Sequence, residues 1–381
     1  MRRIGVALLL IAAGLVWAAV PAAAVADRAG ARTVTPAIAA GGSHSCALLA
    51  NGKVKCWGAN SSGQLGNGNT TNASKPVAVN GLSAGTRAVA ITAGNAHSCA
   101  LLANGTAKCW GFNGSGQLGN GTFTNASTPV DVSGLSTAVA ISAGTNHSCA
   151  LLANGTAKCW GLNASGQLGN GTTTNASTPV VVTGLSTATA ISAGGNHSCA
   201  LLANGTAKCW GLNASGQLGN GTTTNASTPV VVTGLSTATA ITAGGNHSCA
   251  LLANGTARCW GDNDVGQLGN GTLTNSSTPV VVSGLSTAVA ISAGFSHSCA
   301  LLANGTAKCW GYNSSGQLGN GAVTSSSTAV VVSGLTSAVA ISAGTSHSCA
   351  VLANGTAKCW GYNVWGQLGN GTVTSSSTPV F

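Results

Sequence analysis

The sequence is poor in charged side chains, and above all in carboxylates. Its 381 residues include 14 Lys and Arg but only 4 acidic residues, all of them Asp. So few carboxylates leave little material for general acid–base hydrolysis or for a carboxylate metal centre. We therefore expect neither an enzyme nor a bound metal or other cofactor. The positive charges are spread along the chain rather than clustered, which argues against nucleic-acid binding.

The N-terminus has the pattern of an export signal. Arg2 and Arg3 precede an apolar stretch over residues 4–20, and Ala24-Val25-Ala26 offers a cleavage site. We predict a signal peptide over residues 1–26. The alternative is an uncleaved anchor, because 17 apolar residues approach the length of a bilayer span. No later segment could cross a membrane as a helix, so the sequence predicts a secreted or cell-envelope-associated protein with no membrane span after signal removal.

One motif returns seven times along the chain. It reads His-Ser-Cys-Ala-x-Leu-Ala-Asn-Gly-x-x-x-Cys-Trp-Gly, at spacings of 50 residues and once of 53. Residues 147–196 and 197–246 differ only at Ser192 and Thr242. Periods of this size are typical of solenoids, propellers and arrays, whose units bury their apolar faces against one another. We predict a single monomeric domain over residues 37–381, preceded by a short segment over 27–36.

Each repeat is predicted to contain four short β-strands. Apolar and β-branched runs cover residues 179–182, 189–192, 198–202 and 207–210, with Gly-containing turns between them, and no window keeps a helical period over three turns. The fold class is therefore all-β. The longest connector, about 16 residues from Asn163, is expected to pass from the outer strand of one propeller blade to the inner strand of the next. With that phasing the final residues, 378–381, add a strand to the first blade and close the ring, with residues 33–36 as the competing candidate.

The cysteines occur in pairs ten residues apart in a chain with an export signal, so we predict disulfides rather than zinc ligands. A three-residue turn with Gly52 in the left-handed region would place Cys46 directly opposite Cys56. The predicted pairs are Cys46–Cys56, Cys99–Cys109, Cys149–Cys159, Cys199–Cys209, Cys249–Cys259, Cys299–Cys309 and Cys349–Cys359.

The pattern Ala-Gly-x-x-His-Ser-x-Ala-Leu-x-x-Asn-Gly, followed by Trp-Gly-x-Asn-x-x-Gly-Gln-Leu-Gly-x-Gly, resembles the regulator of chromosome condensation repeat. The resemblance implies a seven-bladed β-propeller, here an exported bacterial member. The family includes an exchange factor for a nuclear small GTPase, a plant ultraviolet photoreceptor and a secreted bacterial β-lactamase inhibitor. The first two roles transfer poorly, because Glu is absent and seven of the nine Trp residues occupy one repeated slot that packing explains.

The repeated histidines and the Gly-rich connector are interpreted as structural. Each repeat has one His and no carboxylate at a fixed offset, so we expect its imidazole to bond backbone at a turn. The Gly-Gln-Leu-Gly-Asn-Gly string lacks the Lys and the helix of a phosphate loop. Asp262 and Asp264 form a short acidic patch, for which a calcium ion is a minor alternative.

Binding residues are expected where the repeats differ, because variable loops on a rigid scaffold usually carry recognition. The partner is predicted to be a protein or glycan outside the cytoplasm. The alternatives are drift at tolerant positions, a secreted hydrolase inhibitor and, more remotely, a guanine-nucleotide exchange factor. The candidate binding residues are Phe112, Phe123, Asp262, Asp264, Phe295, Tyr312, Tyr362 and Trp365. Asn95 and Asn146, ahead of a histidine, also vary.

Overall fold

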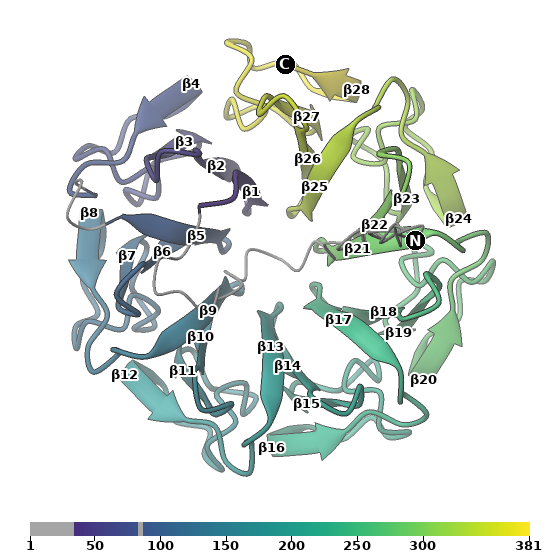
Figure 1. Cartoon of the computed structure of the whole chain (residues 1–381), viewed down its shortest axis with the longest axis horizontal. Helices are drawn as coiled ribbons and strands as arrows, with labels where there is room; N and C mark the ends of the chain where they lie inside the picture. Colours follow the sequence, from purple (N-terminus) through teal and green to yellow (C-terminus); the bar gives the residue numbers. More distant parts are fainter. Residues whose placement is uncertain (1–33, 83–86) are drawn as a thin grey trace, which may run out of the picture.

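The computed structural model describes residues 34–82 and 87–381, and all regular secondary structure in these ranges is β-strand. The strands form seven antiparallel sheets of four strands each, arranged as blades around a central axis (Figure 1). The chain is a seven-bladed β-propeller, as the repeat predicts. The predicted signal peptide, residues 1–26, and most of the segment 27–36 lie outside the described residues.

Within a blade, strands follow one another from the axis outward in chain order. The innermost strands are β1 (Ala37–Ala40), β5 (Ala88–Ala93), β9 (Ala138–Ala143), β13 (Ala188–Ala193), β17 (Ala238–Ala243), β21 (Ala288–Ala293) and β25 (Ala338–Ala343). The second strands are β2 (His44–Leu48), β6 (His97–Leu102), β10 (His147–Leu152), β14 (His197–Leu202), β18 (His247–Leu252), β22 (His297–Leu302) and β26 (His347–Leu352).

The two outer positions complete each sheet. The third strands are β3 (Val54–Gly58), β7 (Ala107–Gly111), β11 (Ala157–Gly161), β15 (Ala207–Gly211), β19 (Ala257–Gly261), β23 (Ala307–Gly311) and β27 (Ala357–Gly361). The outermost strands are β4 (Ala73–Ala78), β8 (Ala126–Asp131), β12 (Ala176–Val181), β16 (Ala226–Val231), β20 (Ser276–Val281), β24 (Ser326–Val331) and β28 (Ser376–Val380).

The predicted blade phasing is wrong by one strand. The Pro-Val-Val strand is the outermost strand of its own blade and pairs with the Cys-Trp-Gly strand before it, as in Cys159↔Val180. The long connector therefore stays within a blade, between its third and fourth strands, and the short link around Gly184 joins blades. The prediction assumed that a long connector must link two blades. This loop is long because it extends over the next blade, where Gly68 N donates to Ser127 O over 2.9 Å.

The predicted closure by the C-terminal strand is also wrong. β28 pairs with β27 of the last blade, and β1 to β4 make a complete first blade without it. The ring closes instead through the contacts that join every other pair of blades. Across this seam Trp57 Nε1 donates to Gln367 O over 2.9 Å, and Thr345 N donates to Gly41 O over 3.0 Å.

The hydrophobic core lies between blades rather than within one sheet. In each interface, a Trp and the connector Leu of the preceding blade are buried together, as Trp110 is with Leu65. Trp110 Nε1 donates to Gln64 O over 2.9 Å. Gly66 must be glycine, because it has φ +68° and any Cβ would lie 2.7 Å from Trp110 Nε1. Buried tryptophans in all seven interfaces confirm that packing explains their repetition.

Each blade carries one buried disulfide between its second and third strands. All seven predicted pairs are joined, with Cα atoms 4.0–4.1 Å apart. Cys46 lies directly opposite Cys56 in the strand register, and Leu49 and Lys53 flank the predicted three-residue turn. Seven intrachain disulfides are typical of an oxidising, non-cytoplasmic compartment.

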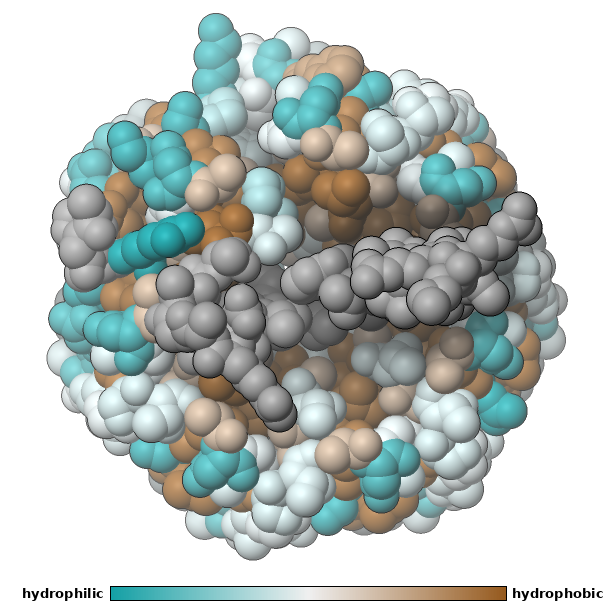
Figure 2. Space-filling view, in the orientation of Figure 1, coloured by the Kyte–Doolittle hydropathy of each residue, from teal (hydrophilic) through white to brown (hydrophobic). Residues whose placement is uncertain are grey.

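The surface repeats from blade to blade as the core does. Figure 2 shows one face, on which hydrophilic and hydrophobic residues alternate around the outer part of the disk. Among the residues described, no helix is long and apolar enough to cross a membrane.

Candidate functional site

The loops that carry the candidate residues gather on one face of the disk. In the second blade His97 pairs with Gly111, and Phe112 N donates to Ala96 O over 2.8 Å, so the turn before His97 and the loop after Gly111 share one end of the blade. We call this end the variable face; in the first blade it comprises residues 41–43 and 59–72, with the equivalent positions elsewhere. All eight candidate residues lie on it, although their spacing in sequence did not show that they share a face.

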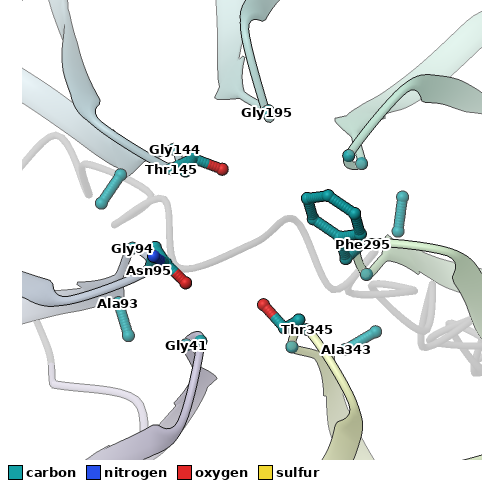
Figure 3. A pocket seen from close by; sticks show the side chains of 18 of the residues that line it. Gly41, Ala93, Gly94, Asn95, Gly144, Thr145, Gly195, Phe295, Ala343 and Thr345 are labelled. Carbon is teal, nitrogen blue, oxygen red and sulfur yellow. The ribbon is translucent and has the colours of Figure 1, made fainter. Parts of the chain in front are cut away.

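A collar of turns surrounds the central opening on this face. The turns meet edge to edge through backbone hydrogen bonds, such as Thr145 N to Gly194 O and Phe295 N to Gly344 O, at 3.0 and 3.1 Å. The open cavity that they surround has a volume of about 80 Å³ (Figure 3). In chain order the blades run counterclockwise in Figure 1 and clockwise in Figure 3. Figure 3 therefore views the opposite face of the disk.

One residue per blade forms the rim of this opening. The rim residues are Gly42, Asn95, Thr145, Gly195, Gly245, Phe295 and Thr345. The side chains of Asn95, Thr145, Phe295 and Thr345 project toward the opening (Figure 3). Asn95 and Phe295 were singled out from the sequence, but Thr145 and Thr345 were missed. The signal that could have found them is variation at the position two residues before each His.

Behind the collar runs a closed ring of His–Ser hydrogen bonds. His97 Nε2 lies 2.8 Å from Ser148 Oγ of the next blade, and Ser148 Oγ donates to Gln117 O over 3.0 Å. Ser148 therefore accepts from His97, which places the proton on Nε2. The histidines are structural as predicted, but the predicted backbone partner is wrong: each imidazole bonds a Ser hydroxyl in the neighbouring blade. The bonded pairs are His44–Ser98, His97–Ser148, His147–Ser198, His197–Ser248, His247–Ser298, His297–Ser348 and His347–Ser45.

The histidines are held in their neutral form. All seven are fully buried, and in the described part of the chain none of their Nδ1 atoms has a hydrogen-bond partner. Burial lowers the pKa to about 4 for His44, His197 and His297, and to about 3 for His97, His147, His247 and His347. Neutral, enclosed imidazoles cannot reach a ligand, so they support the face rather than take part in binding.

A buried Asn holds each variable loop in place. Asn113 Nδ2 donates to Thr122 O and Thr124 O over 3.0 and 3.1 Å, while its Oδ1 accepts from Leu118 N over 2.9 Å. The variable residue Phe112 directly precedes this Asn, and the arrangement repeats in every blade. The loops are therefore fixed by buried polar contacts, and side chains can change on them without loss of loop shape.

The candidate residues differ in their exposure to solvent. Phe123, Phe295, Tyr312 and Trp365 are 55%, 44%, 37% and 45% exposed. Tyr362 is half-buried. Phe112 is half-buried because its ring covers Gly114, where any Cβ would lie 2.6 Å from Cζ.

Four of the candidate aromatic residues, which we call the aromatic group, belong to two neighbouring blades. Phe295 and Tyr312 belong to the sixth blade, and Tyr362 and Trp365 to the seventh. Phe112 and Phe123 lie apart from them on the second blade.

Asp262 and Asp264 belong to the fifth blade, which adjoins the sixth. Asp262 Oδ1 accepts from Asp264 N over 3.3 Å. Burial raises the pKa of Asp262, and the neighbouring Asp264 charge adds to the effect. In residues 34–82 and 87–381, no three His, Cys, Asp or Glu side chains group as metal ligands would.

The fold and this face define a class of protein: a repeat-built β-propeller whose constant residues form the blade interfaces and whose candidate binding residues share one face. The RCC1-like domain family matches residues 17–333, and the Regulator of chromosome condensation (RCC1) repeat matches residues 338–367. The chain belongs to the regulator of chromosome condensation repeat family.

Solved structures confirm the fold. Yeast RCC1 (Prp20), crystallised bound to Kap60, superposes with a TM-score of 0.77 at 23% identity, covering 91% of this chain and 84% of that one. Human WBSCR16 gives a TM-score of 0.74 at 24% identity, with 82% and 85% covered. At such identities the similarity extends to architecture alone.

Curated relatives match over shorter segments. The mitochondrial RCC1 domain-containing protein RUG3 and the ultraviolet-B receptor UVR8, both of Arabidopsis thaliana, are each 35% identical over 99 residues, 26% of this chain and 22% of theirs. The human E3 ubiquitin-protein ligase HERC2 is 36% identical over 97 residues, 25% of this chain and 2% of its own. The chain thus spans about a fifth or less of the length of these relatives.

Proposed function

We propose that the protein is a secreted binding scaffold, not an enzyme, that recognises an extracellular protein or a cell-envelope glycan through the variable face. The observation that carries the proposal is the separation of constant from variable residues. The Trp, His, Ser and Cys positions that recur in every blade are buried, whereas the eight candidate residues, which differ between repeats, all lie at one end of the blades. Aromatic side chains on rigid exposed loops are typical of recognition surfaces.

Secretion is supported by the seven buried disulfides and by the predicted signal over residues 1–26. Disulfides in every blade need an oxidising compartment to form and persist. The test is to recover the protein from the medium of the producing cells and to determine its first residue. Asp27 is expected; intact protein retained in membranes would instead support the uncleaved anchor.

The binding proposal can be tested with substitutions that the repeat itself supplies. Blades three and four carry Leu162 and Leu212 at the position of Tyr312 and Tyr362, and Ser at the position of Trp365. The triple variant Tyr312→Leu, Tyr362→Leu, Trp365→Ser should therefore fold like the native protein. Immobilised native protein is expected to capture a defined protein or polysaccharide from culture supernatant and envelope extracts, and the triple variant about tenfold less.

A matched control changes the same positions in another part of the face. The variant Leu162→Ala, Leu212→Ala, Ser215→Ala alters blades three and four and should capture as much ligand as the native protein. Equal capture by the aromatic variant and this control would remove the aromatic group from the proposed function.

A further inference from the structure

We propose that the collar on the variable face is a socket for the terminal, uncharged sugar of a glycan chain. The inference rests on the proposed function, because it assigns a ligand class to part of the same face. Its starting point is the unusual mixture of groups around the central opening: one aromatic ring, three small polar side chains and a wall of Gly and Ala.

Phe295 supplies an apolar platform. Its ring is 44% exposed at the rim and projects toward the opening (Figure 3). The ring rests against Gly245 of the preceding blade, where any Cβ would lie 3.0 Å from Cγ and Cδ2. Glycine at this position therefore leaves room for the ring. A rigid aromatic face at a concave site suits the apolar face of a sugar ring.

Asn95, Thr145 and Thr345 supply hydrogen-bonding groups around the same opening. Their side-chain oxygens point toward it in Figure 3. Within the described part of the chain these three side chains make no hydrogen bond, since only the backbone N–H groups of Thr145 and Thr345 are engaged. Free hydroxyl and amide groups can both donate to and accept from sugar hydroxyls.

The charge and shape of the collar limit the class of sugar that it could bind. None of the described residues that line it is charged. A sugar acid or phosphate would therefore lose hydration without gaining a charged partner. The cavity of about 80 Å³ is small and open to solvent, and a turn from each of the seven blades surrounds it. The end of a glycan chain can reach the centre of this ring of turns with less contact to the surrounding turns than an internal residue, so we assign the cavity to a terminal sugar.

The test measures binding of single sugars by saturation-transfer NMR and titration. The probes are the methyl glycosides of glucose, galactose, mannose and N-acetylglucosamine, with methyl glucuronide as the charged counterpart of methyl glucoside. At least one neutral glycoside is expected to bind, and more tightly than the glucuronide. Phe295→Gly, which copies Gly195 and Gly245, should weaken binding about tenfold or more, while Phe295→Trp should retain it.

Phe123→Thr is the matched control, because it removes an exposed aromatic residue of the same face and copies Thr173 and Thr223. It should bind the sugar as the native protein does. Linear maltohexaose and its cyclic counterpart, which has no chain end, then test end recognition if the glucoside binds: only the linear form should compete.

Two results would overturn the inference: no neutral glycoside binds the folded protein, or Phe295→Gly binds as tightly as the native chain. Ligand capture that still depends on Tyr312, Tyr362 and Trp365 would then show that the proposed function survives without the socket. Loss of both would overturn both. If a side chain of a partner protein occupied the collar and no sugar bound there, the socket proposal would also be wrong.

Discussion

His347 of the last blade lies 2.8 Å from Ser45 of the first blade, Nε2 to Oγ, in the same geometry that joins His97 to Ser148 inside the ring. Ser45 Oγ in turn donates to Gln367 O over 2.9 Å. The seam where the first and last blades meet is thus one more copy of the general blade interface. Nothing in these contacts distinguishes it from the other six.

This equivalence predicts that Ser45→Ala and Ser148→Ala are equally destabilising. Each removes the acceptor of a fully buried imidazole N–H, which should lower the free energy of unfolding by about 1–3 kcal/mol. Guanidinium unfolding of both variants measures the effect. If Ser45→Ala were several-fold more damaging than Ser148→Ala, the seam would be a weak point and the equivalence would be wrong.

The His ring also predicts loss of stability in acid. In the unfolded chain the histidines titrate near pH 6.5, whereas burial holds their pKa at about 3 to 4 in the fold. Below pH 6.5 the unfolded state therefore binds more protons, and stability falls until the folded-state pKa is reached. Seven sites at roughly 1.4 kcal/mol per pH unit approach about 10 kcal/mol per unit, so the native state should unfold before the folded-state pKa is reached.

The low carboxylate content makes this experiment clean. Carboxylates usually drive acid unfolding, but this chain has only four. Asp131, which forms the one ion pair among the described residues, is exposed. Unfolding midpoints should be constant from pH 8 to 7 and then decline steeply toward pH 4.5. A midpoint that stayed constant down to pH 4.5 would contradict the assignment of neutral, buried histidines.

The sequence predicted the architecture because its signals are local and repeated. Strand runs, Gly turns and the Cys46–Cys56 register each depend on a few neighbouring residues, and seven copies reinforce them. Blade phasing was not predictable in this way. It depends on whether the loop after Gly58 connects two strands of one blade or links one blade to the next. The packing of Leu65 against Trp110 decides this.

The site was predictable only in part for a similar reason. Variation among repeats identified Phe295 and Tyr312 as candidates. It could not show that they lie at the same end of one blade, next to two neighbouring strands. The partner of each His was also hidden, because His97 and Ser148 are 51 residues apart and meet only when the blades pack. Contacts between repeats need the three-dimensional fold.

Two glycines of the third blade have the same backbone conformation but different surroundings, so substituting each of them isolates the effect of packing. Gly169 and Gly184 have φ of +69° and +68°, but a Cβ on Gly169 would lie 2.7 Å from Trp210 Nε1, whereas one on Gly184 would meet nothing within 4 Å. Gly184→Ala should cost only the left-handed backbone term, about 1–2 kcal/mol. Gly169→Ala should add about 1–3 kcal/mol for the clash.

Thermal unfolding of the two variants separates these contributions, and Trp fluorescence reports the displacement of Trp210. The Gly184 variant should keep the native emission spectrum. Equal destabilisation by both substitutions would mean that the loop around Gly169 moves freely off the next blade, contrary to the buried contact seen here.

Strand phasing leads to a prediction about the two ends of the described chain. β28 (Ser376–Val380) is only the outer edge of the last blade, half-exposed along most of its length, whereas β1 (Ala37–Ala40) packs against both the first and last blades. Deletion of residues 376–381 should therefore cost about 1–3 kcal/mol and leave a closed, monomeric ring with seven disulfides. Deletion of residues 34–40 should break the seam and give aggregated or loosely folded protein. Size-exclusion chromatography with small-angle scattering distinguishes the two outcomes. If the C-terminal deletion opened the ring, the result would support closure by the final strand, as first predicted from the sequence. The seam described here would then be wrong.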